Sequence, residues 1–204
     1  NLNEIIFKSK KISRYNIKDK ILFDGENVIA SDDRGNIIFY SVDKKEITYK
    51  YNFYQKNFKK IRKNLNLIVE ANVVYASDNL GYLYALNYKN KKLLWAKNLK
   101  IPFRSNIKIF KEKIITADQN NILYIFNKFD GSQLKFIPTE ETTIKSGFVN
   151  SLALSSDILL YLNTFGSLYS INIQNSQINW FSNFKLSLDL NPTNLFFSNP
   201  IVIS

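Results

Sequence analysis

Three aspartates recur at the same place in a repeated pattern, and their carboxylates are the side chains of this chain best suited to chemistry. Each stands three residues before a glycine or an asparagine, and the pairs are Asp32–Gly35, Asp78–Gly81 and Asp118–Asn121. Carboxylates can ligate a hard metal ion or act as general acids and bases. These aspartates lie in separate repeats without a second carboxylate at ligand spacing, and a fourth copy has Asn163 before Gly166. The pattern therefore favours a turn, in which the side chain accepts a backbone N–H and the glycine or asparagine supplies a left-handed conformation.

The absence of two residue types removes most enzyme templates. The 204-residue chain has no cysteine and no histidine. Disulfides, thiolate nucleophiles and zinc thiolate sites are thereby excluded, and the commonest general base and metal ligand is missing. We therefore expect a protein that is not an enzyme, with no catalytic, cofactor-binding or metal-ligating residues and no cofactor.

The elements that must position these residues are short strands in a fourfold repeat. The turn residues Gly35, Gly81, Asn121 and Gly166 follow one another at intervals of 46, 40 and 45 residues. Apolar segments of four to six residues flank each turn and alternate or run apolar, which is typical of strands rather than of helices. A period of roughly 40–45 residues with four strands per unit predicts an all-β fold, a β-propeller of four-stranded antiparallel blades.

One aromatic residue closes each copy, fourteen or fifteen residues beyond the turn. These residues are Tyr49, Trp95, Phe136 and Trp180, and Phe7 extends the series toward the N-terminus. A buried aromatic ring removes roughly 150–250 Å² from water. Because the position accepts any aromatic residue, we predict packing between neighbouring blades rather than a cofactor site.

The phase of the repeat predicts where the blades begin and end. We expect one propeller domain over 1–204, opening on the last strand of a preceding blade (1–8) and closing on the start of a further blade (190–204). The four blades between them are predicted at 18–55, 65–100, 103–140 and 147–185. Closed propellers have about 4–8 blades, so this phase predicts a fragment of a larger ring.

Individual strands can also be predicted. The second blade should hold strands at Leu65–Glu70, Val73–Ser77, Leu83–Asn87 and Leu93–Asn98. The chain shows neither a signal peptide nor an apolar run of the ~20 residues that cross a bilayer. Because it does not begin with Met, we expect a processed or trimmed product.

The chain is strongly basic, with a net charge of +11. A basic surface attracts nucleic acid or anionic lipid, but the abundance of Lys, Asn and Ile is also the bias expected from an AT-rich genome. The connection after the first blade holds a candidate interaction patch: Lys56, Phe58, Lys59, Lys60, Arg62 and Lys63. Basic residues interleaved with aromatics bind nucleic acid by charge and stacking or lie on an anionic membrane. The alternative, which charge patterning favours, is a solvated loop.

A second connection, Pro138 to Gly147, is polar and links the third and fourth blades. It contains Glu140 and Glu141. Loops on a rigid scaffold commonly carry binding.

Three segments resemble a known repeat. Residues 73–95 read VVYASDNLGYLYALNYKNKKLLW, 127–136 read NKFDGSQLKF, and 166–180 read GSLYSINIQNSQINW. They are similar to the repeat of pyrroloquinoline-quinone-like (PQQ-like) β-propellers, in which a strand, a polar turn with Gly and a second strand precede a closing Trp. The resemblance covers nearly the whole chain and implies the fold rather than a function.

Two branches of that family imply different functions. Quinoprotein dehydrogenases bind the quinone with a calcium ion, a vicinal disulfide and an Asp base, and this chain has no cysteine. The other branch includes the outer-membrane β-barrel assembly lipoprotein (BamB-like), which is a non-enzymatic scaffold. The resemblance to that branch implies protein partners, among them envelope assembly machinery, in the periplasm, with an outer-membrane anchor in the full-length protein. A PQQ-dependent dehydrogenase remains the first alternative. Binding of nucleic acid, the less favoured partner, or peripheral membrane contact remains the second.

Overall fold

The computed structural model describes residues 11–18, 20–54, 58, 60–140, 149–184 and 200–203. The predicted opening strand at 1–8 with Phe7 lies outside the described residues. Lys56 and Lys59 of the interaction patch also lie outside them, as does most of the predicted further blade at 190–204.

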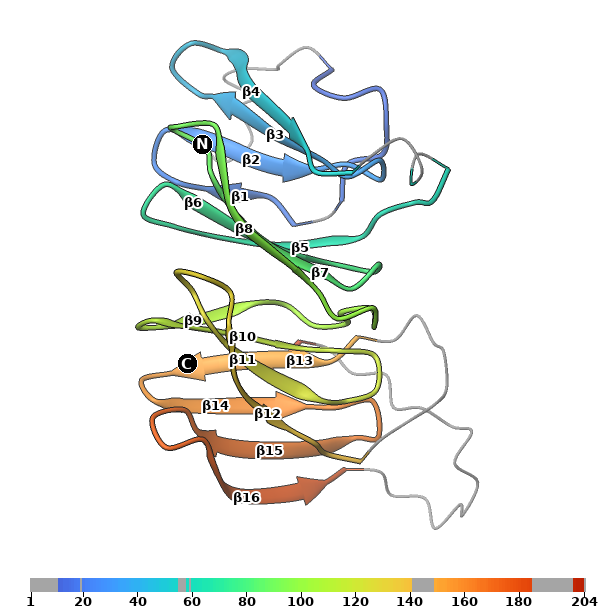
Figure 1. Ribbon diagram of the computed structural model, residues 1–204, viewed down its shortest axis with the longest axis vertical. Helices are drawn as coiled ribbons and strands as arrows, with labels where there is room; N and C mark the ends of the chain where they lie inside the picture. Colours follow the sequence, from blue (N-terminus) through green and yellow to red (C-terminus); the bar gives the residue numbers. More distant parts are fainter. Residues whose placement is uncertain are drawn as a thin grey trace, which may run out of the picture. The chain divides into compact units, whose positions relative to one another are not determined.

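The described residues form four four-stranded antiparallel sheets and contain no α-helix, so the predicted all-β fold is confirmed. Within each sheet the strands follow one another in chain order, each paired with the next (Figure 1). We call the sheets blades 1 to 4. Blade 1 comprises β1 (Leu22–Phe23), β2 (Asn27–Ser31), β3 (Asn36–Ser41) and β4 (Glu46–Asn52). Blade 2 comprises β5 (Leu65–Glu70), β6 (Val73–Asp78), β7 (Tyr82–Asn87) and β8 (Lys92–Asn98).

The remaining two blades repeat this arrangement. Blade 3 comprises β9 (Lys108–Phe110), β10 (Lys113–Ala117), β11 (Leu123–Asn127) and β12 (Gln133–Ile137). Blade 4 comprises β13 (Ser151–Ser155), β14 (Ile158–Leu162), β15 (Ser167–Asn172) and β16 (Gln177–Asn183). The predicted strands of blade 2 begin and end within one residue of the observed ones.

The chain divides into two compact units, which we describe separately. Unit 1 comprises 1–65 and 69–72, and unit 2 comprises 66–68 and 73–204. Blade 1 therefore lies in unit 1. Blades 3 and 4, with most of blade 2, lie in unit 2.

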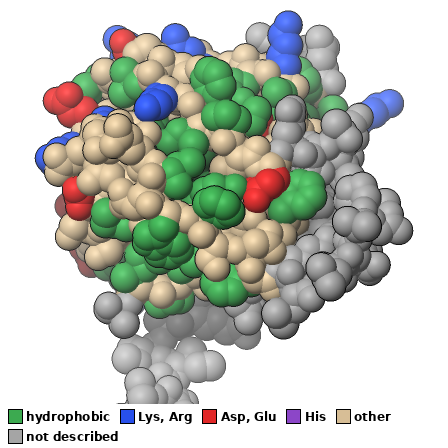
Figure 2. Space-filling model, turned by 90° about the horizontal axis from the view of Figure 1, so that it is seen from below, with side chains coloured by type: hydrophobic (Ala, Val, Ile, Leu, Met, Phe, Trp, Pro, Cys, Tyr) green, Lys and Arg blue, Asp and Glu red, His purple; other side chains and the backbone are tan. Residues whose placement is uncertain are grey.

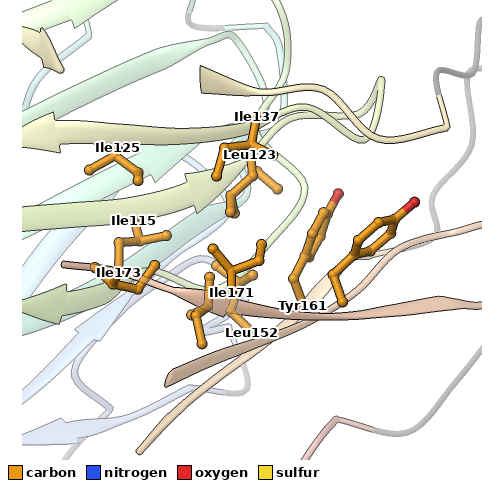
Figure 3. Packing of buried hydrophobic residues seen from close by; sticks show 11 residues of the cluster. Ile115, Leu123, Ile125, Ile137, Leu152, Tyr161, Ile171 and Ile173 are labelled. Carbon is orange, nitrogen blue, oxygen red and sulfur yellow. The ribbon is translucent and has the colours of Figure 1, made fainter. Parts of the chain in front are cut away.

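Two hydrophobic clusters hold the blades of unit 2 together. The first packs Leu83 and Ala85 of β7 with Tyr124 and Phe126 of β11. The second packs side chains of blade 3 against side chains of blade 4 and is shown in Figure 3; it contains Ile115, Leu123, Ile125, Leu152, Tyr161 and Ile171, among others. Each buried side chain of this size contributes about 1.5–3 kcal/mol. The sheets are thus joined face to face by apolar side chains.

Burial changes regularly across each blade. The third strands, such as β7 and β11, are buried along most of their length, whereas the fourth strands are largely exposed. The first strands are sheet edges too but are more buried than the fourth strands, so burial follows the packing of side chains between blades rather than the position in the sheet.

A β-bulge occurs at the same place in every blade. The register between the third and fourth strands shifts directly after Phe39, Ala85, Ile125 and Ser170, which each lie four residues beyond the turn residue. The residues that pair with these four positions are Tyr49, Trp95, Lys135 and Trp180.

The prediction that Phe136 occupies the closing aromatic position of blade 3 is therefore wrong. Phe136 pairs with Tyr124, one register position away, and is 53% exposed. A shift of one residue moves a side chain to the opposite face of a strand. Lys135 takes the position instead, and its Nζ donates to the carbonyl of Ser176 at 3.1 Å.

Candidate interaction face

The repeated polar residues build the same turn in all four blades, between the second and third strands. Oδ1 of the side chain accepts hydrogen bonds from the backbone N–H groups two and four residues further on. The paired distances are 3.0 and 3.0 Å for Asp32, 2.8 and 2.8 Å for Asp78, 2.8 and 3.0 Å for Asp118, and 3.0 and 3.1 Å for Asn163. The turn residues have positive φ angles of 81° for Gly35, 87° for Gly81, 66° for Asn121 and 81° for Gly166.

Each of these side chains is thus engaged by its own turn. The carboxylate of Asp32 is fully buried and also accepts from the hydroxyl of Ser13 at 2.9 Å and from Nδ2 of Asn36 at 2.7 Å. Among the described residues, no three acidic, cysteine or histidine side chains gather as a metal site would require. The geometry therefore gives these residues a role in the backbone rather than in chemistry.

The connections between blades leave at the same end as these turns, because each blade has an even number of antiparallel strands. Backbone hydrogen bonds mark the junctions: Leu99 donates to the carbonyl of Gly81 at 2.9 Å, and Phe184 donates to that of Gly166 at 2.8 Å. We call this end of unit 2 the turn face; it comprises the turns at 78–81, 118–121 and 163–166 and the connections at 99–107, 138–140 and 149–150.

A carboxylate on the turn face joins blade 3 to blade 4. Glu140 follows β12 and accepts hydrogen bonds from three side chains of blade 4: Ser167 at 2.6 Å, Tyr169 at 2.6 Å and Asn163 at 2.7 Å. Its backbone carbonyl accepts from Nδ2 of Asn121 at 3.0 Å. The network therefore ties the connection to both neighbouring turns.

The electrostatics of this network follow from its hydrogen bonds. Partial burial acts to raise the pKa of Glu140, but the hydrogen bonds from Ser167, Tyr169 and Asn163 outweigh burial and leave the pKa below its usual value. Burial, together with donation to the Glu140 carboxylate, raises the pKa of the Tyr169 phenol. Glu140 is thus held as the charged acceptor and Tyr169 as the neutral donor at neutral pH.

Arg104 and Asn150 lie where the connections enter blades 3 and 4. The N–H of Asn150 donates to the carbonyl of Arg104 at 2.7 Å, and its Nδ2 donates to the carbonyl of Asp118 at 2.8 Å. Nε of Arg104 and Oδ1 of Asn150 are buried and make no hydrogen bond to the described protein atoms. Burial lowers the pKa of Arg104, although a guanidinium stays charged at neutral pH. The turn face thus contains one buried donor, Nε of Arg104, and one buried acceptor, Oδ1 of Asn150, that make no hydrogen bond within the described part of the chain.

In unit 1 the structure corrects the predicted interaction patch at Lys63. Its side chain is only 2% exposed, with Nζ 5.1 Å from the ring centroid of Tyr54 and donating to the carbonyl of Phe58. Tyr54 and Lys63 also cover Gly35, where an added Cβ would lie 2.3 Å from the Tyr54 ring. The lysine is thus an internal packing residue, and its charge does not reach the surface.

The other described residues of the predicted interaction patch differ in their exposure. Lys60 and Arg62 are exposed, and Phe58 is partly buried. The described part of the patch therefore brings two cations to the surface rather than a continuous basic and aromatic strip, and its role in binding stays a prediction.

The closing aromatic residues differ in their surroundings. Trp95 packs against the cluster between blades 2 and 3, its ring lies under Gly131, and its Nε1 donates to the carbonyl of Lys128 at 3.0 Å. Tyr49 stacks on Phe39 within blade 1, with ring centroids 5.4 Å apart. Trp180 is 50% exposed.

Sequence reasoning missed the residues that organise the turn face. The sequence indicates only that Glu140 belongs to a polar connection, and the signal for its role is its position shortly after the last strand of blade 3. Arg104 and Asn150 carry no local signal, because Arg104 contacts the backbone of Ala117 and Asn150, and Asn150 contacts the backbone of Asp118, which are all distant in sequence.

These features define the class: the chain is a β-propeller protein. No protein-family model matches the sequence, and no curated protein matches it in sequence. Solved structures do match in fold. BamB from Moraxella catarrhalis shares 14% identity at a TM-score of 0.74, over 95% of this chain and 59% of that chain.

Two further propellers show the same likeness. The β-propeller domain of Cps50 (Swd1) from Myceliophteria thermophila shares 9% identity at a TM-score of 0.66, over 86% of this chain and 58% of that chain. A chain in a crystal structure of the mitotic checkpoint complex shares 10% identity at a TM-score of 0.65, over 80% of this chain and 50% of that chain. This chain thus spans less than two thirds of each of these structures. Within the described part, no helix is long and apolar enough to cross a membrane.

Proposed function

We propose that this protein is a non-enzymatic protein-interaction scaffold of the bacterial cell envelope, located in the periplasm and assisting outer-membrane protein assembly. The observation that carries the proposal is the likeness to BamB over 95% of the chain. The similarity of residues 73–95 and 166–180 to PQQ-like repeats supports the same branch of propellers.

The chemistry of the turns also supports a scaffold. The recurring aspartates are engaged by backbone N–H groups, and Glu140 is engaged by three side chains of the next blade. Polar residues that could do chemistry are thus used to fix the positions of turns and connections. A rigid face with irregular connections suits binding of another protein.

Co-purification tests this function. The tagged chain is isolated after cross-linking from the membrane and soluble fractions of the cells that produce it. We expect outer-membrane assembly proteins in the membrane fraction. Recovery with soluble cytosolic proteins alone would overturn the envelope role.

A dye-reduction assay tests the non-enzymatic part. The protein is supplied with pyrroloquinoline quinone and calcium and given alcohols or sugars with a dye acceptor. We expect no reduction of the dye above the rate without protein. Protein-dependent reduction would show a dehydrogenase instead.

A further inference from the structure

Blade 4 is almost free of charge in a strongly basic protein. From Ser151 to Asn183 the one charged residue is Asp157. Charged residues make up 22% of the whole chain, so a segment of this length would be expected to carry about seven. The difference concentrates an uncharged surface on one blade.

The outer edge of blade 4 differs from the other three outer edges. β16 pairs only with β15 among the described strands, and all seven of its residues are exposed. β4, β8 and β12 each carry at least one lysine, namely Lys50, Lys92 with Lys97, and Lys135, whereas β16 reads QINWFSN. Lysines on an edge strand oppose pairing with another chain, and the seven residues of β16 include none.

Large apolar side chains occupy both faces of this edge. Phe181 pairs with Tyr169 and stacks on it with ring centroids 5.6 Å apart, while Trp180 pairs with Ser170 on the opposite face. Phe181 is 64% exposed and Trp180 is 50% exposed. Figure 2 views the molecule from the side of β16 and shows hydrophobic side chains gathered toward the middle of this face, with most Lys and Arg at its margin.

We propose that β16 binds an extended, uncharged segment of a partner protein, which adds a fifth strand to blade 4. A basic surface attracts acidic partners, but the seven residues of β16 include no cation to pair with a carboxylate. Adjacent residues of an added strand would lie beside Trp180 and Phe181 on opposite faces. The segment therefore carries two consecutive large apolar residues flanked by uncharged polar ones. This inference rests on the proposed scaffold function and names the surface and the kind of segment that it binds.

The natural neighbour of β16 supplies a probe. A labelled, end-blocked peptide with the sequence of residues 166–173, GSLYSINI, is uncharged and already pairs with β16 in the fold. Its binding to the full chain is measured by fluorescence anisotropy, and a peptide with lysine in place of its tyrosine is the control. We expect the first peptide to bind at least tenfold more tightly than the second. Because no ion pair forms, raising the salt concentration should not weaken binding.

Matched variants locate the binding site. Phe181→Lys puts the missing lysine on β16, and Leu94→Lys makes the same change on β8, where Leu94 is 45% exposed. Ser182→Lys is a second β16 variant that removes no apolar side chain, and it keeps the test valid if Phe181→Lys fails to fold. We expect at least a tenfold loss of peptide affinity for the β16 variants and no change for Leu94→Lys. Equal binding by wild type and Ser182→Lys, or no binding by wild type, would overturn the inference.

Three outcomes separate this inference from others. If sedimentation shows a dimer that Ser182→Lys dissociates, β16 pairs with a second copy and the proposed partner is wrong. If Ser182→Lys still co-purifies with the partners of the wild type, the edge is not their site but the scaffold function stands. If neither protein recovers a partner, the scaffold function itself fails.

Discussion

At the scale of single residues, the recurring turn needs an acceptor oxygen rather than a negative charge. Asn163 in blade 4 accepts the same two backbone N–H groups as Asp118 in blade 3, at 3.0 and 3.1 Å compared with 2.8 and 3.0 Å. This equivalence explains why sequence spacing alone identified the turns. The same comparison shows how to test whether the side chain acts as an acceptor or as a charge, by exchanging Asp for Asn.

We predict that Asp118→Asn lowers the free energy of unfolding by less than about 1 kcal/mol, whereas Asp118→Ala lowers it by about 2–3 kcal/mol. The asparagine keeps Oδ1 for the N–H groups of Asn120 and Ile122, and the hydroxyl of Tyr124 can reverse its role toward the new amide. The alanine leaves two N–H groups without their acceptor. Urea denaturation measures both values, and equal losses for the two variants would contradict a role as acceptor.

The Glu140 network predicts a pH dependence. Its pKa is lowered in the folded state, so the stabilisation is present above the usual carboxyl pKa and is lost as the pH falls through the folded value. We expect Glu140→Gln to cost about 1–2 kcal/mol at neutral pH. Because the variant has no carboxylate to protonate at this position, lowering the pH should destabilise it less than the wild type.

Thermal unfolding at several pH values measures this difference. Ser167→Ala is the matched control, because it removes one donor and leaves the carboxylate. A wild type and a Glu140→Gln variant with parallel pH profiles would show that the carboxylate is not stabilised by the fold.

Lys63 shows that residue type alone does not predict whether a side chain is exposed. A lysine among other cations is usually at the surface, and the sequence therefore placed it in an exposed patch. Its burial depends on Tyr54, which comes nine residues earlier, and on the backbone of Asp33, whose carbonyl accepts the N–H of Lys63 at 2.9 Å. Such contacts form only when a connection folds back on a turn, and no local pattern reports them.

At the scale of elements, the strands were predictable and the register was not. Apolar segments between turn signals located the strands, because inner strands are buried on both faces and read as apolar runs. The bulge in each blade left no signal of its own. In blade 3 the aromatic residue stands one position later than in the other blades, and the bulged register gives its predicted position to Lys135.

The turn between the third and fourth strands offers a test at this scale. The fourth residue after the third strand has a left-handed conformation in every blade, with φ of 68° for Gly131 and 59° for Ser176. We predict that Ser176→Gly raises the free energy of unfolding by up to about 1 kcal/mol, since a non-glycine residue is strained there.

The reverse change at the equivalent position should destabilise. An alanine at Gly131 would place its Cβ 2.5 Å from Cε3 of Trp95, in addition to the strained φ. We expect Gly131→Ala to cost about 1–3 kcal/mol. Denaturant midpoints measure both variants, and a stabilising Gly131→Ala would contradict the packing of this turn on Trp95.

At the scale of the whole molecule, the charge is distributed unevenly along the chain. The chain carries a net charge of +11, but blade 4 is nearly neutral. If the basic charge served nucleic acid, the logarithm of the affinity for DNA would fall steeply with the logarithm of the salt concentration. We expect weak DNA binding that Lys60→Gln with Arg62→Gln leaves nearly unchanged in filter binding. A loss of tenfold or more would restore the nucleic-acid interpretation.

The central claim is that this propeller is a scaffold that binds partner proteins, and site-specific photo-cross-linking in the cells that produce it tests the claim most directly. A photoreactive residue is placed at Phe181 on β16 and, as the control, at Phe129, which is exposed on a turn of blade 3. We predict cross-links to envelope proteins from position 181 and none from position 129. Cross-links from position 129 alone, or from neither position, would contradict the account.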